Sequence, residues 1–350
     1  MRFIVTFAGT ARSIVLSSLI AAVLYMSGLL VLVTPLPLIY VSAARGRWAG
    51  FAAAALSLAA VCAIYLALYP SGGAAAASGL ATYLPIPGEG LAGFMQHGSL
   101  RVIGIGYFAF YVAVALALGE GARFRWSVSR WGGIGLLAGG CVIAAVSSWL
   151  LASGGSAILQ GIDAYVKFVV NQIVEANAAS GAASTQAALL ADHADEVTAF
   201  ILQMMPSLVS VFAIFAVVVN LVIGRRLIKN HHPFSHVHNV ARFRLPDVMV
   251  WAVIAAGVSF FGDRYAAHTG WLSLVALNCI IVLGALYFFQ GLAVTVYLLQ
   301  GIRFPLLRTL AYVAMIIFLQ AASVMLVLLG VADVWVDFRL RRWRALHHQS

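Results

Sequence analysis

The sequence predicts an all-α fold, a polytopic bundle of transmembrane helices that forms a single integral membrane domain over residues 1–350. Hydrophobic residues make up 63% of the chain and charged residues only 9%, whereas a soluble domain is about half apolar and a quarter charged. Several apolar runs approach or exceed the length of about 20 residues that crosses a bilayer. These runs lack the alternation that is typical of a transmembrane β-barrel.

About eight or nine hydrophobic segments are expected along the chain. Pro35 and Pro37 should break the first helix, so that the second segment is short. Broken backbone is tolerated in a membrane only where protein or a cavity shields it. The expected segments are 13–33, 35–44, 48–69, 101–119, 133–152, 200–223, 248–261, 271–299 and 306–331.

The net charge of +10 is explained by membrane topology. Basic residues gather in short loops beside the hydrophobic segments, as they do in loops that face the cytoplasm. Residues 224–246 contain no acidic residue and are predicted to form a basic cytoplasmic loop, and residues 332–350 a basic C-terminal tail on the same side. We expect a lipid bilayer around the chain and no nucleic-acid partner.

The polar stretch 153–199 is predicted to be an outward-facing amphipathic insertion. Its acidic residues outnumber its single lysine, which indicates the side opposite the basic loops. Apolar residues recur at helical spacing in its first half, which favours a helix on the membrane surface or over the mouth of a cavity. These apolar residues are Ile158, Ile162, Tyr165, Val169 and Ile173.

A stripe of polar side chains on the segment 271–299 is the candidate pocket. Tyr287, Gln290 and Tyr297 share one helical face. Two phenols and an amide could line a small-molecule site, with Gln320 on the last segment as a further member. The same groups could instead make an interhelical hydrogen bond, which contributes roughly 1 kcal/mol in membranes. Both interpretations remain open.

No enzyme, cofactor or metal site is expected. The loop "NHHPFSHVHNVARFR" contains four histidines, but they lie among cations without a nearby cysteine or carboxylate. The glycines of "GGIGLLAG" open a membrane segment rather than a strand–turn–helix unit, which excludes a dinucleotide site. No nucleophile elbow, zinc-protease motif or phosphate-binding loop is present.

The end of the last segment carries two acids, Asp333 and Asp337, one helical turn apart. Asp337 lies four residues before Arg341, which is a favourable order for an ion pair. Asp333 has no base one turn later, so we expect it to pair with another helix and lock the two together, or to face a cavity. Arg339 could stack on Trp335, which lies on a neighbouring face.

Three stretches of the sequence, "PLPLIYVSAARGRWAG", "YFFQGLAVTVYLLQG" and "GVADVWVDFR", resemble the YybS-like family of bacterial membrane proteins of unknown function. The most specific positions are Gln290 with Gly291, then Asp333 and Asp337 with Phe338 and Arg339. The resemblance covers most of the chain and implies a multi-pass protein of the bacterial inner (plasma) membrane.

The family is also distantly similar to the substrate-binding components of energy-coupling-factor transporters. That similarity implies a small-molecule ligand, with a transmembrane coupling protein and ATPase subunits as partners. We therefore expect a transporter-like, small-solute-binding membrane component. The alternative is a non-transport scaffold that recruits partners through its basic loop and tail.

Overall fold

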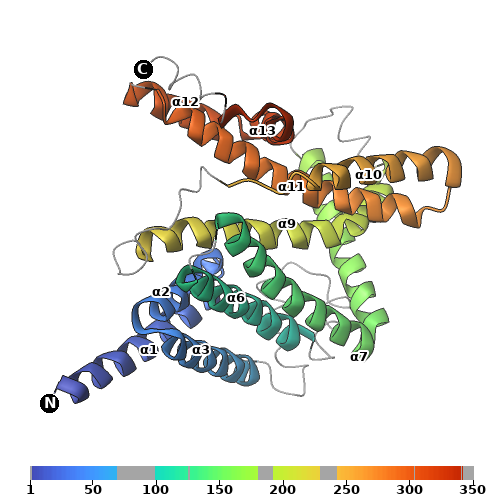
Figure 1. Cartoon of the computed structure of the whole chain (residues 1–350). Coiled ribbons are helices and arrows are strands. Elements are labelled where there is room, and N and C mark those ends of the chain that lie inside the picture. Colours follow the sequence, from blue (N-terminus) through green and yellow to red (C-terminus); the bar gives the residue numbers. More distant parts are fainter. Residues whose placement is uncertain are drawn as a thin grey trace, which may run out of the picture.

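The computed structural model describes residues 2–68, 99–124, 127–179, 192–228, 243–302, 304–339 and 341, and every regular element in these ranges is a helix (Figure 1). The first half of the chain contributes α1 (Arg2–Met26), the short 3₁₀ helix η1 (Val31–Val33), α2 (Pro35–Arg45), α3 (Arg47–Leu68), α6 (Ser99–Arg123), α7 (Val128–Ala179) and α9 (Ala194–Ile228). The second half contributes α10 (Met249–Gly262), the π-helix η3 (Asp263–Ala267), α11 (Trp271–Leu299), α12 (Pro305–Ile317) and α13 (Leu319–Val336).

Among the described residues, seven helices contain a stretch long and apolar enough to cross a membrane, namely α1, α3, α6, α7, α9, α11 and α13. The predicted all-α membrane bundle is thus confirmed. Helix α10 has 14 residues and is shorter than a span, although the π-helix η3 extends it. In Figure 1, α9 runs between the other helices of the first half and the helices of the second half, and it packs against α7, α2 and α11.

The predicted break near Pro35 and Pro37 is confirmed. Helix α1 ends at Met26, and α2 begins at Pro35, a position where the missing N–H costs nothing. The backbone freed by the break has a partner on α9, because the amide of Asn220 donates to the carbonyl of Leu32 at 2.6 Å. The break is therefore shielded by protein, as a membrane requires.

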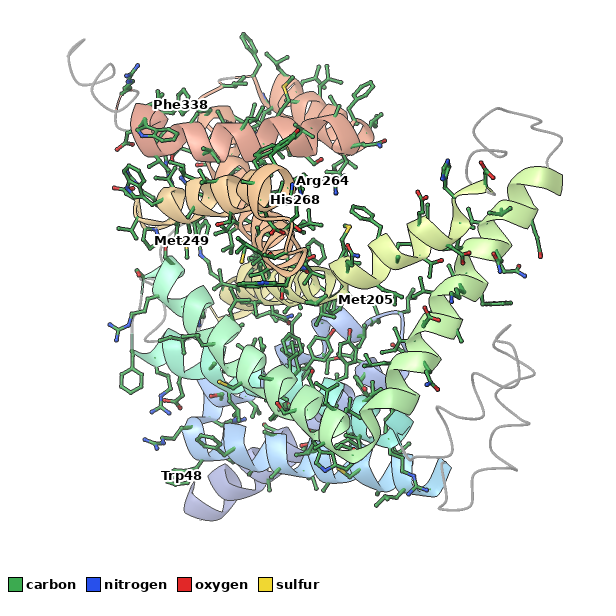
Figure 2. The ribbon with its side chains drawn as sticks, turned by 90° about the vertical axis from the view of Figure 1, so that its right-hand side faces the viewer. Trp48, Met205, Met249, Arg264, His268 and Phe338 are labelled. Carbon is green, nitrogen blue, oxygen red and sulfur yellow. The ribbon has the colours of Figure 1, made fainter. Side chains whose placement is uncertain are left out.

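Helix α7 is longer than predicted. We expected a span over 133–152 and then a separate amphipathic insertion, but the helix runs unbroken through both as 52 residues. It changes direction part-way along its length (Figure 2). The buried side chains of its second arm are Val166 and Val170, whereas Tyr165 and Ile173 of the predicted apolar face are about half exposed. Residues 180–191 of the predicted insertion lie outside the described residues.

The predicted segment 306–331 is divided in two. Phe318 leaves the helical conformation with φ −97° and ψ 32°, which ends α12 and starts α13. No proline or glycine stands at this point of the sequence, so the usual signal of a helix break is missing.

The turn between α10 and α11 is held by a buried acid. The carboxylate of Asp263 accepts hydrogen bonds from the backbone of Thr269, Gly270 and Ser273 at 2.8–3.0 Å. These N–H groups lie around the start of α11, where the helix itself provides no acceptor. The hydrogen bonds from Thr269 are the main reason that the pKa of Asp263 lies well below its usual range.

Candidate functional site

Helices α11 and α13 cross in direct backbone contact. Gly291 and Gly330 make the contact possible, because a Cβ atom on Gly291 would lie 1.9 Å from the carbonyl oxygen of Leu326. A Cβ atom on Gly330 would lie 2.1 Å from the carbonyl oxygen of Tyr287. Small residues allow membrane helices to approach closely, and here they bring the polar groups of both helices together.

Gln290 is fully buried at this crossing. Its side-chain nitrogen donates to the carbonyl of Gly330 at 3.1 Å and to the carboxylate of Asp333 at 3.3 Å. Its side-chain oxygen accepts from the backbone N–H of Leu245 at 3.0 Å. The side-chain amide of Gln290 thus joins α11, α13 and the segment 243–246 before α10. Both of its N–H groups donate a hydrogen bond within the protein.

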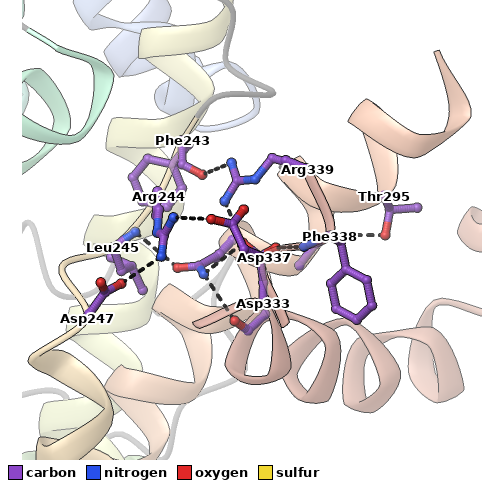
Figure 3. A network of polar contacts seen from close by, with 12 residues as sticks. Phe243, Arg244, Leu245, Asp247, Thr295, Asp333, Asp337, Phe338 and Arg339 are labelled. Atoms are coloured by element: carbon purple, nitrogen blue, oxygen red, sulfur yellow. Dashed lines mark hydrogen bonds and ion pairs between the residues drawn. The ribbon is translucent and has the colours of Figure 1, made fainter. Parts of the chain in front are cut away.

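Asp333 has no exposed surface and accepts three hydrogen bonds (Figure 3). Besides Gln290, its donors are the guanidinium of Arg339 at 2.5 Å and the backbone N–H of Phe338 at 3.2 Å. Arg339 also donates to the carbonyl of Phe243 at 2.8 Å. The base that pairs with Asp333 is thus six residues further along the chain, and the carboxylate also contacts α11.

Asp337 supplies the turn that brings Arg339 back. Its backbone is left-handed, with φ 45°, and it ends α13. Its carboxylate accepts from Arg244 at 3.0 Å, and Arg244 also donates to Asp247 at 3.1 Å (Figure 3). Partial burial lowers the pKa of Arg244, but these hydrogen bonds outweigh it, so the net shift is upward. We call Gln290, Asp333, Asp337, Arg339 and Arg244 the α13 lock.

The structure places three of the predicted pocket residues on α11 and the fourth, Gln320, on α13. Tyr287 is fully buried like Gln290, and its hydroxyl has no hydrogen-bond partner. Tyr297 is partly buried further along α11. Gln320 is exposed on α13, just after the break at Phe318. The four side chains therefore line neither of the two cavities described next.

The larger of these cavities has a volume of about 880 Å³ and lies between both arms of α7, α9 and α11. We call it the α7–α9 cavity. Gly140, Ala144 and Ser147 line it from the first arm of α7, and Ile162 and Tyr165 from the second. Its lining contains no charged side chain. The sequence analysis missed this cavity, although small residues at spacings of four and three on α7 could have indicated a recessed helix face.

A second cavity of about 680 Å³ lies between α9, α10 and α11. We call it the α10–α11 cavity. It too has no charged residue in its lining, and its polar side chains are three serines and Asn278. Asn278 lies on α11 like Gln290, but twelve residues earlier and on a different face of the helix.

The described residues contain no group of three or more histidine, cysteine or acidic side chains that could hold a metal ion. The four-histidine loop lies outside the described residues, as does most of the basic loop 224–246 and of the tail 332–350. Of the basic loop, residues 224–228 belong to the end of α9, and 243–246 form the segment that contacts Gln290.

A family model with the description "Predicted membrane protein (DUF2232)" matches residues 99–334. The matched part runs from the start of α6 almost to the end of α13 and includes the lining of both cavities. No curated protein and no solved structure matches the chain.

Proposed function

The chain belongs to this family of predicted membrane proteins (DUF2232), and we propose that it is a transporter-like membrane component that binds a small, uncharged, apolar solute in the α7–α9 cavity. The proposal moves the binding site away from Tyr287, Gln290, Tyr297 and Gln320. It assigns no chemical reaction to the chain.

The observation that carries the proposal is the cavity itself. Its volume of about 880 Å³ falls in the range of roughly 300–1,000 Å³ that is usual for small-molecule sites. Such sites are mostly apolar, with a few polar groups that orient the ligand, and Ser147, Tyr165 and Ser210 could serve here. A charged ligand would lose its hydration without gaining an ionic partner, so the ligand should be uncharged within the cavity.

The α13 lock supports the proposal indirectly. Gln290 would be a poor ligand-binding residue, because both of its N–H groups are donated to Gly330 and Asp333. Its geometry favours the interhelical alternative that the sequence left open. A fixed α11 would in turn provide a stable wall for the cavity, to which it contributes Val282 and Leu286.

Photolabelling of the purified protein in detergent tests the solute site. The probe is a neutral 16-carbon alcohol that carries a diazirine, and unlabelled 1-hexadecanol is the competitor. We expect saturable labelling that maps to α7, α9 and α11. Ala144→Phe should fill the cavity and weaken binding at least about tenfold, which is ~1.4 kcal/mol.

Ala145→Phe is the matched control, since Ala145 is the neighbouring exposed residue of α7 and does not line the cavity. It should bind the probe as the unchanged protein does. Equal labelling of both variants would show that the cavity is not the binding site.

We further propose that the chain works in the inner membrane of a bacterium with a transmembrane coupling protein and ATPase subunits. Affinity purification in mild detergent, followed by mass spectrometry, tests this part separately. Recovery of a coupling protein with ATPase subunits would support it. Recovery of unrelated partners, lost when the basic tail is removed, would favour the scaffold alternative instead.

A further inference from the structure

The two cavities are separated by a single ridge. Three residues, Pro206 and Ser210 of α9 and Val282 of α11, line both of them. The ridge between the two cavities therefore consists of the contact between α9 and α11. The α7–α9 cavity lies on one side of this contact and the α10–α11 cavity on the other.

The ridge is held in place by Asn278. Pro206 lies inside α9, and next to it the side chain of Asn278 bridges Ser207 and Gln203, two residues that a regular helix joins by a backbone hydrogen bond. Its oxygen accepts from the N–H of Ser207 at 2.9 Å, and its nitrogen donates to the carbonyl of Gln203 at 2.9 Å. The same nitrogen donates to the carbonyl of Leu274 at 2.9 Å. A ridge fixed by hydrogen bonds in this way keeps the two cavities distinct.

The polar groups of the cavities include a cluster at the ridge. Ser207, Ser210 and Asn278 lie there, and Ser210 donates to the carbonyl of Pro206 at 2.8 Å, which leaves its oxygen able to accept another hydrogen bond. Away from the ridge, the lining is largely alanine, leucine and valine on the side of α10 and α11. This arrangement suits a molecule with a polar linker at the ridge and an apolar arm on each side.

We infer that the two cavities are the two halves of one binding site, and that its ligand is an uncharged lipid with two apolar chains that straddles the ridge. The inference rests on the proposed function and specifies the class of its ligand. The absence of charged side chains from both linings favours an uncharged ligand. The setting supports it as well, because α9 and α11, which line both cavities, are helices long and apolar enough to cross a membrane.

Cys279 provides a reporter in the second half of the site, since it lines the α10–α11 cavity and carries a free, exposed thiol. Cys62 and Cys141 are first replaced by alanine. The alkylation rate of Cys279 by N-ethylmaleimide is then followed by intact mass in delipidated, detergent-solubilised protein. We expect 1,2-dioleoylglycerol to slow this rate about tenfold at ten times its Kd.

The variant Ala144→Phe then distinguishes a single site that spans both cavities from two independent sites. It fills the α7–α9 cavity, on the far side of the ridge from Cys279. If the lipid straddles the ridge, protection of Cys279 by dioleoylglycerol is lost in Ala144→Phe and kept in Ala145→Phe. Without ligand, Cys279 should be alkylated at the same rate in both variants, which shows that the second cavity is intact.

Two results would overturn the inference. Undiminished protection by dioleoylglycerol in Ala144→Phe would mean that the α10–α11 cavity binds by itself. If dioleoylglycerol fails to protect Cys279 in the protein that keeps both Ala144 and Ala145, the α10–α11 cavity does not bind this lipid. Neither result affects the photolabelling of the α7–α9 cavity, so the proposed function is judged separately.

Discussion

The carboxylate of Asp333, which has no exposed surface, lies 2.5 Å from the guanidinium of Arg339, six residues further along the chain. A helix would place these residues too far apart around its axis for such a contact. They meet because Asp337, between them, adopts a left-handed conformation that ends α13. The residues after α13 therefore fold back onto the end of that helix.

Asp333→Asn should lower the free energy of unfolding by about 3–5 kcal/mol, because it leaves the guanidinium of Arg339 without its charge partner in a buried place. Arg339 keeps only 13% of its side chain exposed. The measurement is unfolding of the purified protein in mixed micelles by increasing denaturing detergent. The matched control is Arg244→Gln at the pair with Asp337, whose side chains are about one-third exposed, and it should cost less than about 1 kcal/mol. Equal losses in both variants would contradict a special role for Asp333.

Gly291→Ala should separate α11 from α13. The added Cβ atom would lie 1.9 Å from the carbonyl oxygen of Leu326, which is backbone and cannot rotate away. Overpacking of this kind costs about 1–3 kcal/mol, and here it should also loosen the hydrogen bonds of Gln290. Gly284→Ala on the same helix is the control, since its Cβ atom would meet nothing within 4 Å. It should be neutral or stabilise by up to about 1 kcal/mol through helix propensity. The same unfolding assay compares the two.

Stability should depend on Asp263 in acid. The pKa of this carboxyl is depressed in the folded protein by the hydrogen bonds from Thr269 and Ser273. A depressed folded pKa stabilises the folded state above the unfolded value of about 3.9, and the contribution is lost as the pH falls below that value toward the folded pKa.

Unfolding followed from pH 6 down to pH 3 should therefore show a loss of stability below about pH 4. This component should be absent in Asp263→Asn, which should be less stable than the unchanged protein at pH 6. Identical profiles for the two proteins would contradict the role of Asp263 as the cap of α11.

Residue patterns predicted the membrane bundle and the break before Pro35, because apolar run length and proline chemistry act locally. They also indicated that Asp333 contacts another helix or faces a cavity, and Gln290 of α11 does donate to it, although its charged partner follows α13 in the same chain. They could not identify Arg339 as the charged partner, since the contact depends on the left-handed conformation of Asp337, which is uncommon for any residue except glycine even though aspartate adopts it more often than most. The break at Phe318 has no local signal in the sequence. The change in polarity near residue 153 predicted that the span ends there, but α7 continues through it.

The shape of the cavities depends on how α7, α9 and α11 pack together. Residue spacing within one segment does not predict how separate helices pack. Gln290 illustrates the difficulty. Its position on the stripe with Tyr287 is compatible with a pocket or with an interhelical bond, and only the proximity of Gly330 and Leu245 shows which groups it contacts. Pro206 and Asn278 are both visible as unusual residues in apolar spans, yet their pairing joins positions on two different helices.

A double-mutant cycle on Pro206 and Asn278 tests that pairing directly. Asn278→Leu should cost about 1 kcal/mol or more, because it leaves the N–H of Ser207 and the carbonyl of Gln203 without partners. Pro206→Ala removes the proline ring that crowds the preceding turn of α9, so that Ser207 can donate to Gln203 as in a regular helix. In the Pro206→Ala background, Asn278→Leu should therefore cost less than about 0.5 kcal/mol, and the difference is the coupling energy of the two residues. Additive losses in the cycle would mean that Asn278 does not replace the missing hydrogen bond, and that the ridge between the two cavities is maintained by packing alone.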